Sequence, residues 1–263
     1  PREPLVPRRL GKNMCVPFGK ILRGKVVPNT VTKTLHTDKV YEPDLNSFTI
    51  EPFPYYSPLK SQIETIKSFD RPVILVDDLV HTANRLQVLV PQLREDGIPI
   101  KKVVVGVLSG YGRDLMQCLK VPVESIYSMP NLRQWFVEST LYPFIGGDTV
   151  RREEMKVAGL QPSINMILPY ATPRLSGCSR EALVEFSACC IENSRDLFQV
   201  LEAEYRKMYA KNLTLSRLSE AVILPLCPDK GSCMEYDENL AASVYLENDL
   251  ETLWRMKEFM IKG

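Results

Sequence analysis

A run of branched aliphatic residues at positions 73–76 ends abruptly in two carboxylates, Asp77 and Asp78. Pro72 precedes the run, and a short apolar run bounded by proline and charge is typical of a strand buried on both faces of a parallel sheet. The two aspartates then mark the carboxyl end of the strand. Because ligands of open α/β sheets bind in the crevice outside those ends, we expect this stretch to lie at a binding site.

The residues after the aspartates predict a polar loop and then a helix. The loop contains His81, Thr82 and Asn84, and apolar residues recur after it at intervals of three and four. The amino terminus of a helix offers unpaired N–H groups and a partial positive charge, to which Thr82 and Asn84 add hydrogen-bond donors. This predicts a phosphate site, and the carboxylates beside it could bind sugar hydroxyls directly or through Mg²⁺. A phosphate and a diol together indicate a ribose phosphate.

The stretch from Val73 to Leu86 resembles the phosphoribosyl-pyrophosphate motif of the type I phosphoribosyltransferases: four hydrophobic residues, two acids, two hydrophobics and a loop that opens a helix. The resemblance implies that Asp77 and Asp78 are catalytic, hold the ribose hydroxyls and contact the Mg²⁺ that arrives with phosphoribosyl pyrophosphate. It assigns the 5′-phosphate to the loop residues His81, Thr82, Ala83, Asn84 and Arg85.

This chain departs from the family at three positions of the loop. The family usually has a small hydroxyl residue where His81 stands, glycine where Ala83 stands and threonine where Arg85 stands. These departures concern catalysis more than fold. The alternative is a strand that simply ends in a solvated Asp-Asp turn.

Composition limits the partners and the cellular setting that we expect for the protein. The net charge is +1 and 25% of the residues are charged, so the sequence predicts no broad cationic face that would attract nucleic acid. It contains no apolar run long enough to span a membrane and no signal peptide at its start. The seven cysteines form no C-x-x-C pair and there are only two histidines, which argues against a disulfide framework and a zinc site. We expect a soluble, cytoplasmic protein.

Strands and helices are predicted to alternate around the motif. An apolar helical pattern precedes the central strand, and a strand, a helix and another strand follow the motif helix. These elements are expected at 59–69, 102–108, 113–119 and 124–128. Their order predicts right-handed parallel crossovers, and hence an α/β fold with a doubly wound, mostly parallel sheet.

Proline and glycine residues mark the expected kinks, helix ends and turns in this region. Pro91 should kink or split the motif helix, and Gly97 should end it. Gly110-Tyr111-Gly112 follows a predicted strand, as in a dinucleotide-binding loop. The third glycine of that loop is missing and the next strand does not end in an acid, so the dinucleotide-binding interpretation fails.

A polar, β-branched segment at 29–39 carries Lys33, His36 and Lys39 at intervals of three. It predicts a mobile loop or an exposed pair of strands. The segment is similar to the flexible loop of orotate-type phosphoribosyltransferases, which closes over the pyrophosphate. That resemblance implies catalytic roles for Lys33 and His36 and a ligand-binding role for Lys39. An ordinary solvated loop is the alternative.

The carboxyl-terminal part of the sequence predicts helices. After an irregular segment at 131–173, Ser179 is a capping residue for a long helix, and shorter helices are expected at 214–223 and 246–261. Apolar residues repeat at intervals of about 3.5 along the long helix. The helices are expected either to cover the sheet or to pair with another copy, and this stripe predicts that the protein is a homodimer or a larger oligomer.

Across nearly its full length the chain also looks like bacterial phosphoribosyltransferase-like modules that lie downstream of a cytidylyltransferase-like domain. The residues that carry this similarity lie at 73–79, 142–148 and 212–216. The similarity implies that the chain is a fragment of a longer polypeptide with an amino-terminal nucleotidyltransferase domain. It implies no established reaction.

We therefore expect a phosphoribosyltransferase-type α/β domain at 1–175, including an extended lead-in, and a helical extension packed on it at 176–263. The first functional hypothesis is a glycosyltransferase-class enzyme that moves a phosphoribosyl group from phosphoribosyl pyrophosphate to an unidentified acceptor with Mg²⁺. The second is a non-catalytic nucleotide-binding or regulatory module, and the third is a structural dimerisation unit. Pyrophosphate release separates the first two hypotheses, and nucleotide affinity separates the last two.

Overall fold

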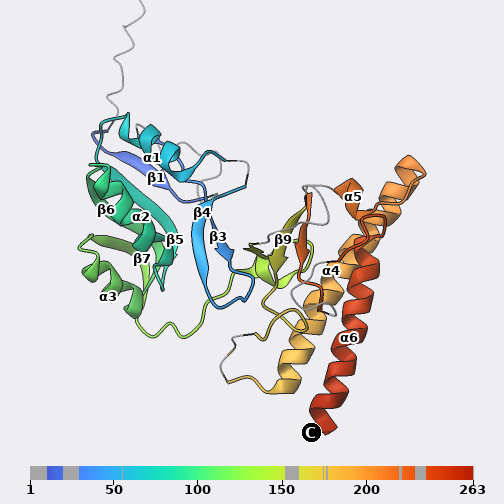
Figure 1. Cartoon of the computed structure of the whole chain (residues 1–263). Coiled ribbons are helices and arrows are strands. Elements are labelled where there is room, and N and C mark those ends of the chain that lie inside the picture. The colour runs from blue at the N-terminus through green and yellow to red at the C-terminus, as the bar shows by residue number, and fades with distance from the viewer. Residues whose placement is uncertain are drawn as a thin grey trace, which may run out of the picture. The chain divides into compact units, whose positions relative to one another are not determined.

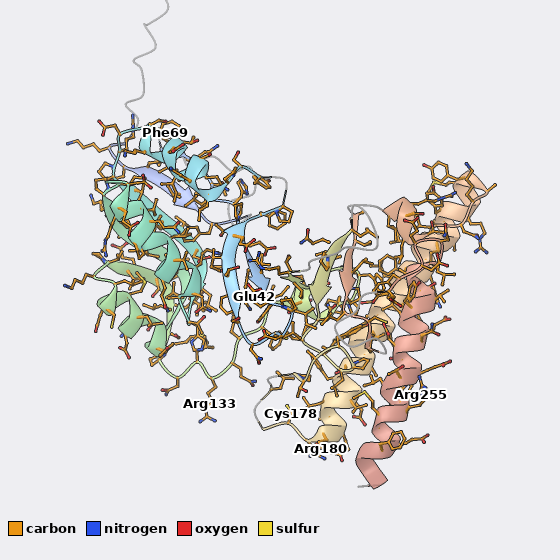
Figure 2. All side chains as sticks on the ribbon, viewed as in Figure 1. Glu42, Phe69, Arg133, Cys178, Arg180 and Arg255 are labelled. Atoms are coloured by element: carbon orange, nitrogen blue, oxygen red, sulfur yellow. The ribbon has the colours of Figure 1, made fainter. Side chains whose placement is uncertain are left out.

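The computed structural model describes residues 11–19, 30–54, 56–151, 160–173, 175, 177–218, 221–228 and 235–262, and most of the lead-in at 1–30 lies outside these ranges. The chain divides into two compact units (Figure 1). The first comprises Pro1–Asp38 and Ile50–Arg133, and the second comprises Lys39–Thr49 and Gln134–Gly263. Arg133, labelled in Figure 2, is therefore the last residue of the first unit. The boundary expected near residue 175 falls inside the second unit.

The first unit contains a five-stranded sheet with the order β2-β1-β5-β6-β7, and every pair of neighbouring strands in it is parallel. Its strands are β1 (Met14–Pro17), β2 (Val31–Thr32), β5 (Val73–Val80), β6 (Ile100–Ser109) and β7 (Val123–Met129). The strands predicted around residue 73, at 102–108 and at 124–128 are confirmed. The α/β class is confirmed with them.

Three helices accompany this sheet (Figure 1): α1 (Leu59–Lys67), α2 (Asn84–Glu95) and α3 (Gly110–Cys118). Ile63, Leu89 and Met116 from the three helices share one core with the strands and are almost fully covered. The prediction that Pro91 could split the motif helix is wrong, since α2 continues through that residue. Gly97 follows the end of α2 with a φ of +76°, as its predicted role as a helix terminator requires.

Strand β5 is longer than the sequence predicted, and one of its faces is more deeply buried than the other. Its residues alternate between buried and more exposed, and Val73 and Leu75 belong to the core shared with the helices. The expectation of a strand buried on both faces is therefore wrong. The strand also does not end at the carboxylates, because its pairing with β6 continues to Val80. Sequence alone suggested an end there because a charged pair normally stops a buried strand.

The second unit contains most of a second five-stranded sheet, which the sequence did not predict. Its order is β10-β9-β8-β3-β4, with β8 and β9 antiparallel. The strands are β3 (Thr37–Tyr41), β4 (Phe48–Pro52), β8 (Asp148–Val150), β9 (Gln161–Ile164) and β10 (Ile223–Pro225), and a 3-10 helix, η1 (Glu138–Leu141), precedes β8. The helix expected at 214–223 is wrong beyond its first turn, because α5 (Leu215–Leu218) is short and the chain then enters β10.

Two long helices, α4 (Arg180–Tyr209) and α6 (Ala242–Lys262), confirm the remaining helical predictions. Ser179 caps α4 as expected, since its Oγ accepts the Ala182 N–H at 3.2 Å. The helices lie side by side and antiparallel (Figure 1). Glu202, near the end of α4, accepts hydrogen bonds from Ser243 at the start of α6, and Glu185, near the start of α4, pairs with Lys257 at 3.7 Å.

The apolar stripe of α4 divides into two parts. Leu183, Phe186 and Cys190 pack in the core of the second unit. Leu197 and Leu201, by contrast, are 46% and 44% exposed. Periodicity along a helix shows that a face is apolar, but it does not show what covers that face.

Candidate functional site

The candidate site lies where β5 parts from β1. On the β1 side of β5 the pairing ends at Pro17 and Val76, whereas on the β6 side it continues to Val80. The strand order also reverses here, since the chain places β2 on one side of β1 and β5, β6 and β7 on the other. Such a switch point, at the carboxyl ends of parallel strands, is where open α/β sheets hold their ligands. Asp77 is the first residue of β5 beyond the pairing with β1.

Asp77 is buried and paired with an arginine from the first turn of α2. Its residue exposure is 7%, and Arg85 Nη1 lies 3.1 Å from Asp77 Oδ1 and 3.4 Å from Oδ2. The Arg85 guanidinium also lies 5.4 Å from the centre of the Phe18 ring, just past β1. Three segments of the first unit therefore meet around one carboxylate: the end of β1, β5 and the start of α2.

Burial dominates the acidity of Asp77. Loss of solvation raises the pKa of its carboxyl from 3.8 to about 7, although the Arg85 charge pulls that pKa down. The neighbouring Asp78 charge raises it further. A carboxylic acid with a pKa near neutrality, buried at the carboxyl edge of a sheet, is a candidate for a functional residue.

Asp78 differs from its neighbour in being exposed. Its Oδ1 accepts the Leu79 N–H at 2.8 Å, and its own N–H donates to Asp77 Oδ1 at 3.0 Å. Within the described residues, no group of three or more His, Cys, Asp or Glu side chains is arranged to hold a metal ion. Mg²⁺ is commonly held by one or two carboxylates together with substrate phosphates and water. The exposed carboxylate of Asp78 suits that role better than Asp77, whose oxygens already accept hydrogen bonds from Arg85 and Asp78.

The predicted phosphate loop forms a tight turn before α2. Asn84 Nδ2 donates to Thr82 Oγ1 at 3.0 Å, and Gln87 Nε2 donates to the Thr82 carbonyl at 2.9 Å. Ala83 occupies the N-cap position in a left-handed conformation, with φ +51° and ψ +21°, and provides no side-chain cap. The first N–H groups of α2 can therefore donate to an anion, although the side-chain amide of Asn84 already donates to Thr82.

Replacing Ala83 with glycine should stabilise the protein. A left-handed φ costs an alanine about 1–2 kcal/mol that glycine avoids, and glycine is also the better N-cap. The entropy cost of glycine and the loss of the buried Ala83 methyl offset most of this, so Ala83→Gly should gain about 0.5 kcal/mol. The check is the free energy of unfolding in urea. Ala203→Gly, at an exposed helical position of α4, is the control and should lose about 1 kcal/mol. A loss at Ala83 equal to that at Ala203 would contradict the geometry of the turn.

His81 lies at the carboxyl edge of the sheet beside the end of β6. Its Nδ1 is 2.8 Å from Ser109 Oγ, and its ring meets the Tyr111 ring edge-on with centroids 6.0 Å apart. The sequence singled out His81 but not Ser109, Tyr111 or Phe18. Ser109 could have been found, since it ends the strand next to β5 and immediately precedes a helix.

The structure places the three residues of the predicted closing loop in different settings. Lys33 is exposed after β2, and its backbone N–H donates to Cys15 O in β1 at 3.0 Å. His36 stacks on Tyr56 at 3.8 Å between ring centroids, within the first unit. Lys39 belongs to the second unit, where its Nζ contacts Tyr41 Oη at 2.6 Å and Asp148 Oδ2 at 3.3 Å. The segment thus holds β2 and the start of β3, which lie in two different sheets.

Searches of known protein families and of curated proteins give no match for this chain. Among solved structures, the AQ2163 protein from Aquifex aeolicus is similar to it, with 19% sequence identity and a TM-score of 0.31. The alignment covers 44% of this chain and about half, 54%, of that one. A similarity of this size supports no inference about the site. In the described part of the chain, no helix combines the length and the apolar character needed to cross a membrane.

Proposed function

We propose that the first unit is a doubly wound domain of the phosphoribosyltransferase type and that it binds a ribose phosphate where β5 parts from β1. One observation carries the proposal: a carboxylate buried at this point, Asp77, lies beside a helix that begins without a side-chain cap. A buried carboxylate accepts strong hydrogen bonds from hydroxyl groups, and an uncapped helix start binds anions. A sugar phosphate presents both groups at once.

In this proposal each residue has a defined part. The hydroxyls of the ribose bind Asp77 and Asp78, and the phosphate lies against the turn at Thr82 and Ala83. Mg²⁺ arrives with a pyrophosphate-bearing ligand and is held through Asp78. Arg85 already neutralises Asp77, so it either moves to the phosphate or stays as the partner of Asp77 when the ligand binds.

The test is ligand-induced stabilisation with a panel of nucleotides, ribose 5-phosphate and phosphoribosyl pyrophosphate, each with Mg²⁺. A ligand at one hundred times its Kd stabilises the folded state by about 2.7 kcal/mol. We expect ribose phosphates to raise the melting temperature and free ribose or sulfate to leave it unchanged. An equal response to sulfate would reduce the site to a simple anion site.

A second candidate, catalytic transfer of the phosphoribosyl group, is favoured by the pKa of Asp77 near 7. Pyrophosphate release in the presence of nucleobases distinguishes it from binding alone. The left-handed Ala83 and the hydrogen bond of Asn84 to Thr82 leave the phosphate loop imperfectly shaped for its ligand. We therefore expect turnover far below the ordinary enzymatic rate of about 10 s⁻¹. A regulatory module of an attached nucleotidyltransferase would bind the ligand in the same way without releasing pyrophosphate.

We also propose that the chain dimerises through the exposed stripe of α4. Leu197, Val200, Leu201 and Met208 lie on this stripe and are between 44% and 66% exposed.

Sedimentation velocity at micromolar concentration should therefore show a dimer. Leu201→Glu should convert it to a monomer, because a charge would replace an apolar contact. Val244→Glu, at an exposed apolar position of α6, serves as the control and should leave the dimer intact. A parent protein that sediments as a monomer would rule out this interface.

A further inference from the structure

Ser109 forms a buried link between the start of α3 and His81. Its residue exposure is 1%, and its Oγ accepts the Gly112 N–H at 2.9 Å as the cap of α3. The same oxygen lies 2.8 Å from His81 Nδ1. The hydroxyl has one proton to donate, and Nδ1 is the acceptor that the described contacts offer for it.

These contacts decide which nitrogen of a neutral His81 carries the proton. If Nδ1 carried it, both neighbours of Ser109 Oγ would be donors, and the hydroxyl proton would be buried without an acceptor. Buried polar groups are nearly always hydrogen-bonded, so that arrangement is disfavoured. The hydroxyl therefore donates to Nδ1, and the proton of the neutral imidazole resides on Nε2.

The glycines at the start of α3 allow this helix to pack closely beside the link. A Cβ on Gly112 would lie 2.2 Å from the Val80 carbonyl oxygen, and one on Gly110 would lie 2.6 Å from the Pro130 carbonyl oxygen. Only glycine lets the first turn of α3 approach the end of β5 so closely. His81 directly follows Val80, and the pairing of Val80 with Leu108 in the sheet places Ser109 beside it. Gly110-Tyr111-Gly112 thus has a packing role in place of the dinucleotide role that the sequence excluded.

We infer that Ser109 is a positioning residue that holds His81 as the Nε2–H tautomer, so that the outer N–H of the ring donates to an oxygen of the bound phosphate. The His81 residue is half-buried, and its ring meets the Tyr111 ring edge-on. At this position the type I phosphoribosyltransferases usually have a small hydroxyl residue. The neutral His81 ring can donate a hydrogen bond to the phosphate in its place, and it needs no positive charge to do so. The assignment of a phosphate as the ligand of His81 rests on the proposed ribose-phosphate site. The assignment of the His81 tautomer does not.

The chain suits a direct test, because it contains only two histidines, His36 and His81. Long-range proton–nitrogen NMR spectra at about pH 8.5, where histidine is ordinarily neutral, report which nitrogen of each ring is protonated. His36→Gln assigns the signals. We expect His81 in the parent to show a single Nε2–H tautomer, and in Ser109→Ala to show a mixture of tautomers, with Ser109→Thr restoring the single form.

Titration with ribose 5-phosphate provides the second readout. Ser109→Ala should weaken binding about three- to tenfold, the value of one neutral hydrogen bond. Ser179→Ala removes the cap of α4 in the same way, so it controls for a loss of helix stability and should leave both the His81 tautomer and the affinity unchanged.

The outcomes separate the two claims. An Nδ1–H tautomer in the parent, or a spectrum that Ser109→Ala leaves unchanged, overturns the inference. A parent with the Nε2–H tautomer that fails to bind ribose 5-phosphate overturns the proposed function and the donor role of His81, while the tautomer assignment stands.

Discussion

Asp77→Asn should make the protein more stable at pH 8 by about 2–4 kcal/mol. Asparagine keeps the shape of the side chain and its acceptor oxygen but removes a buried charge. A carboxyl pKa that rises from 3.8 to about 7 on folding corresponds to an opposing free energy of about 4 kcal/mol once the group is ionised in both states. The attraction of Arg85 is already included in this free energy, because the Arg85 charge lowers the pKa of Asp77 that burial raises.

The pH dependence of this effect has a definite sign. Between pH 3.8 and about 7 the folded state of the parent holds a proton on Asp77 that the unfolded chain has released, so its stability falls as the pH rises. Below that range the parent and Asp77→Asn should have equal stability, and above it the gap should be constant. Urea unfolding at a series of pH values measures the gap.

Asp114→Asn on α3 is the matched control, because its side chain is exposed and the change should stay within about 0.5 kcal/mol at every pH. A parent that is more stable than Asp77→Asn at pH 8 would show that the pair with Arg85 outweighs the cost of burial. That result would remove the physical reason for regarding Asp77 as functional.

Arg85→Ala should have the opposite effect, and its size should depend on Asp77. In the parent at pH 8 the substitution leaves a buried carboxylate without its cation, which we expect to cost about 3 kcal/mol. In the Asp77→Asn background the contact with Phe18 and a hydrogen bond to a neutral amide oxygen are lost, and the cost should fall to about 1 kcal/mol. The difference of about 2 kcal/mol is the coupling free energy between the two side chains.

A double-mutant cycle by urea unfolding measures this coupling. Arg94→Ala in the same helix is the control, because Arg94 bonds the Lys120 carbonyl at 3.1 Å and has no part in the site. Its cost should be small and equal in both backgrounds. Costs for Arg85→Ala that are equal within about 0.3 kcal/mol would show that the pair is only a surface ion pair.

The sequence predicted the first unit well because its signals are local and strong. The run at 73–76 and the valines of β6 are long enough to be read as strands, and the stripe beginning at Leu86 has a clear helical period. The position of Asp77 at the carboxyl edge followed from these elements. The pairing that carries β5 on to Val80 could not be predicted, because it depends on the length of β6 beside it.

The second sheet escaped prediction because its strands are short and mixed in composition. β8 and β10 have three residues each, and β9 contains a proline, so none shows a period. The sequence also could not show which side chains of the site pair with one another. The sequence suggested that Arg85 binds phosphate, whereas the structure pairs it with Asp77, eight residues earlier. The left-handed Ala83 is a further feature that only the backbone reveals, since alanine carries no signal for that conformation.

The central claim is that Asp77 and Asp78 form the sugar side of a ribose-phosphate site, and calorimetric titration of ribose 5-phosphate with Mg²⁺ at about pH 8 tests it most directly. At that pH the carboxyl of Asp77 is ionised, since its pKa is about 7. The account predicts that the parent binds and that Asp77→Asn with Asp78→Asn binds at least about tenfold more weakly, from the loss of charge-assisted hydrogen bonds. The double variant should still unfold cooperatively. Equal affinity in the two proteins, or no binding by the parent, would contradict the account.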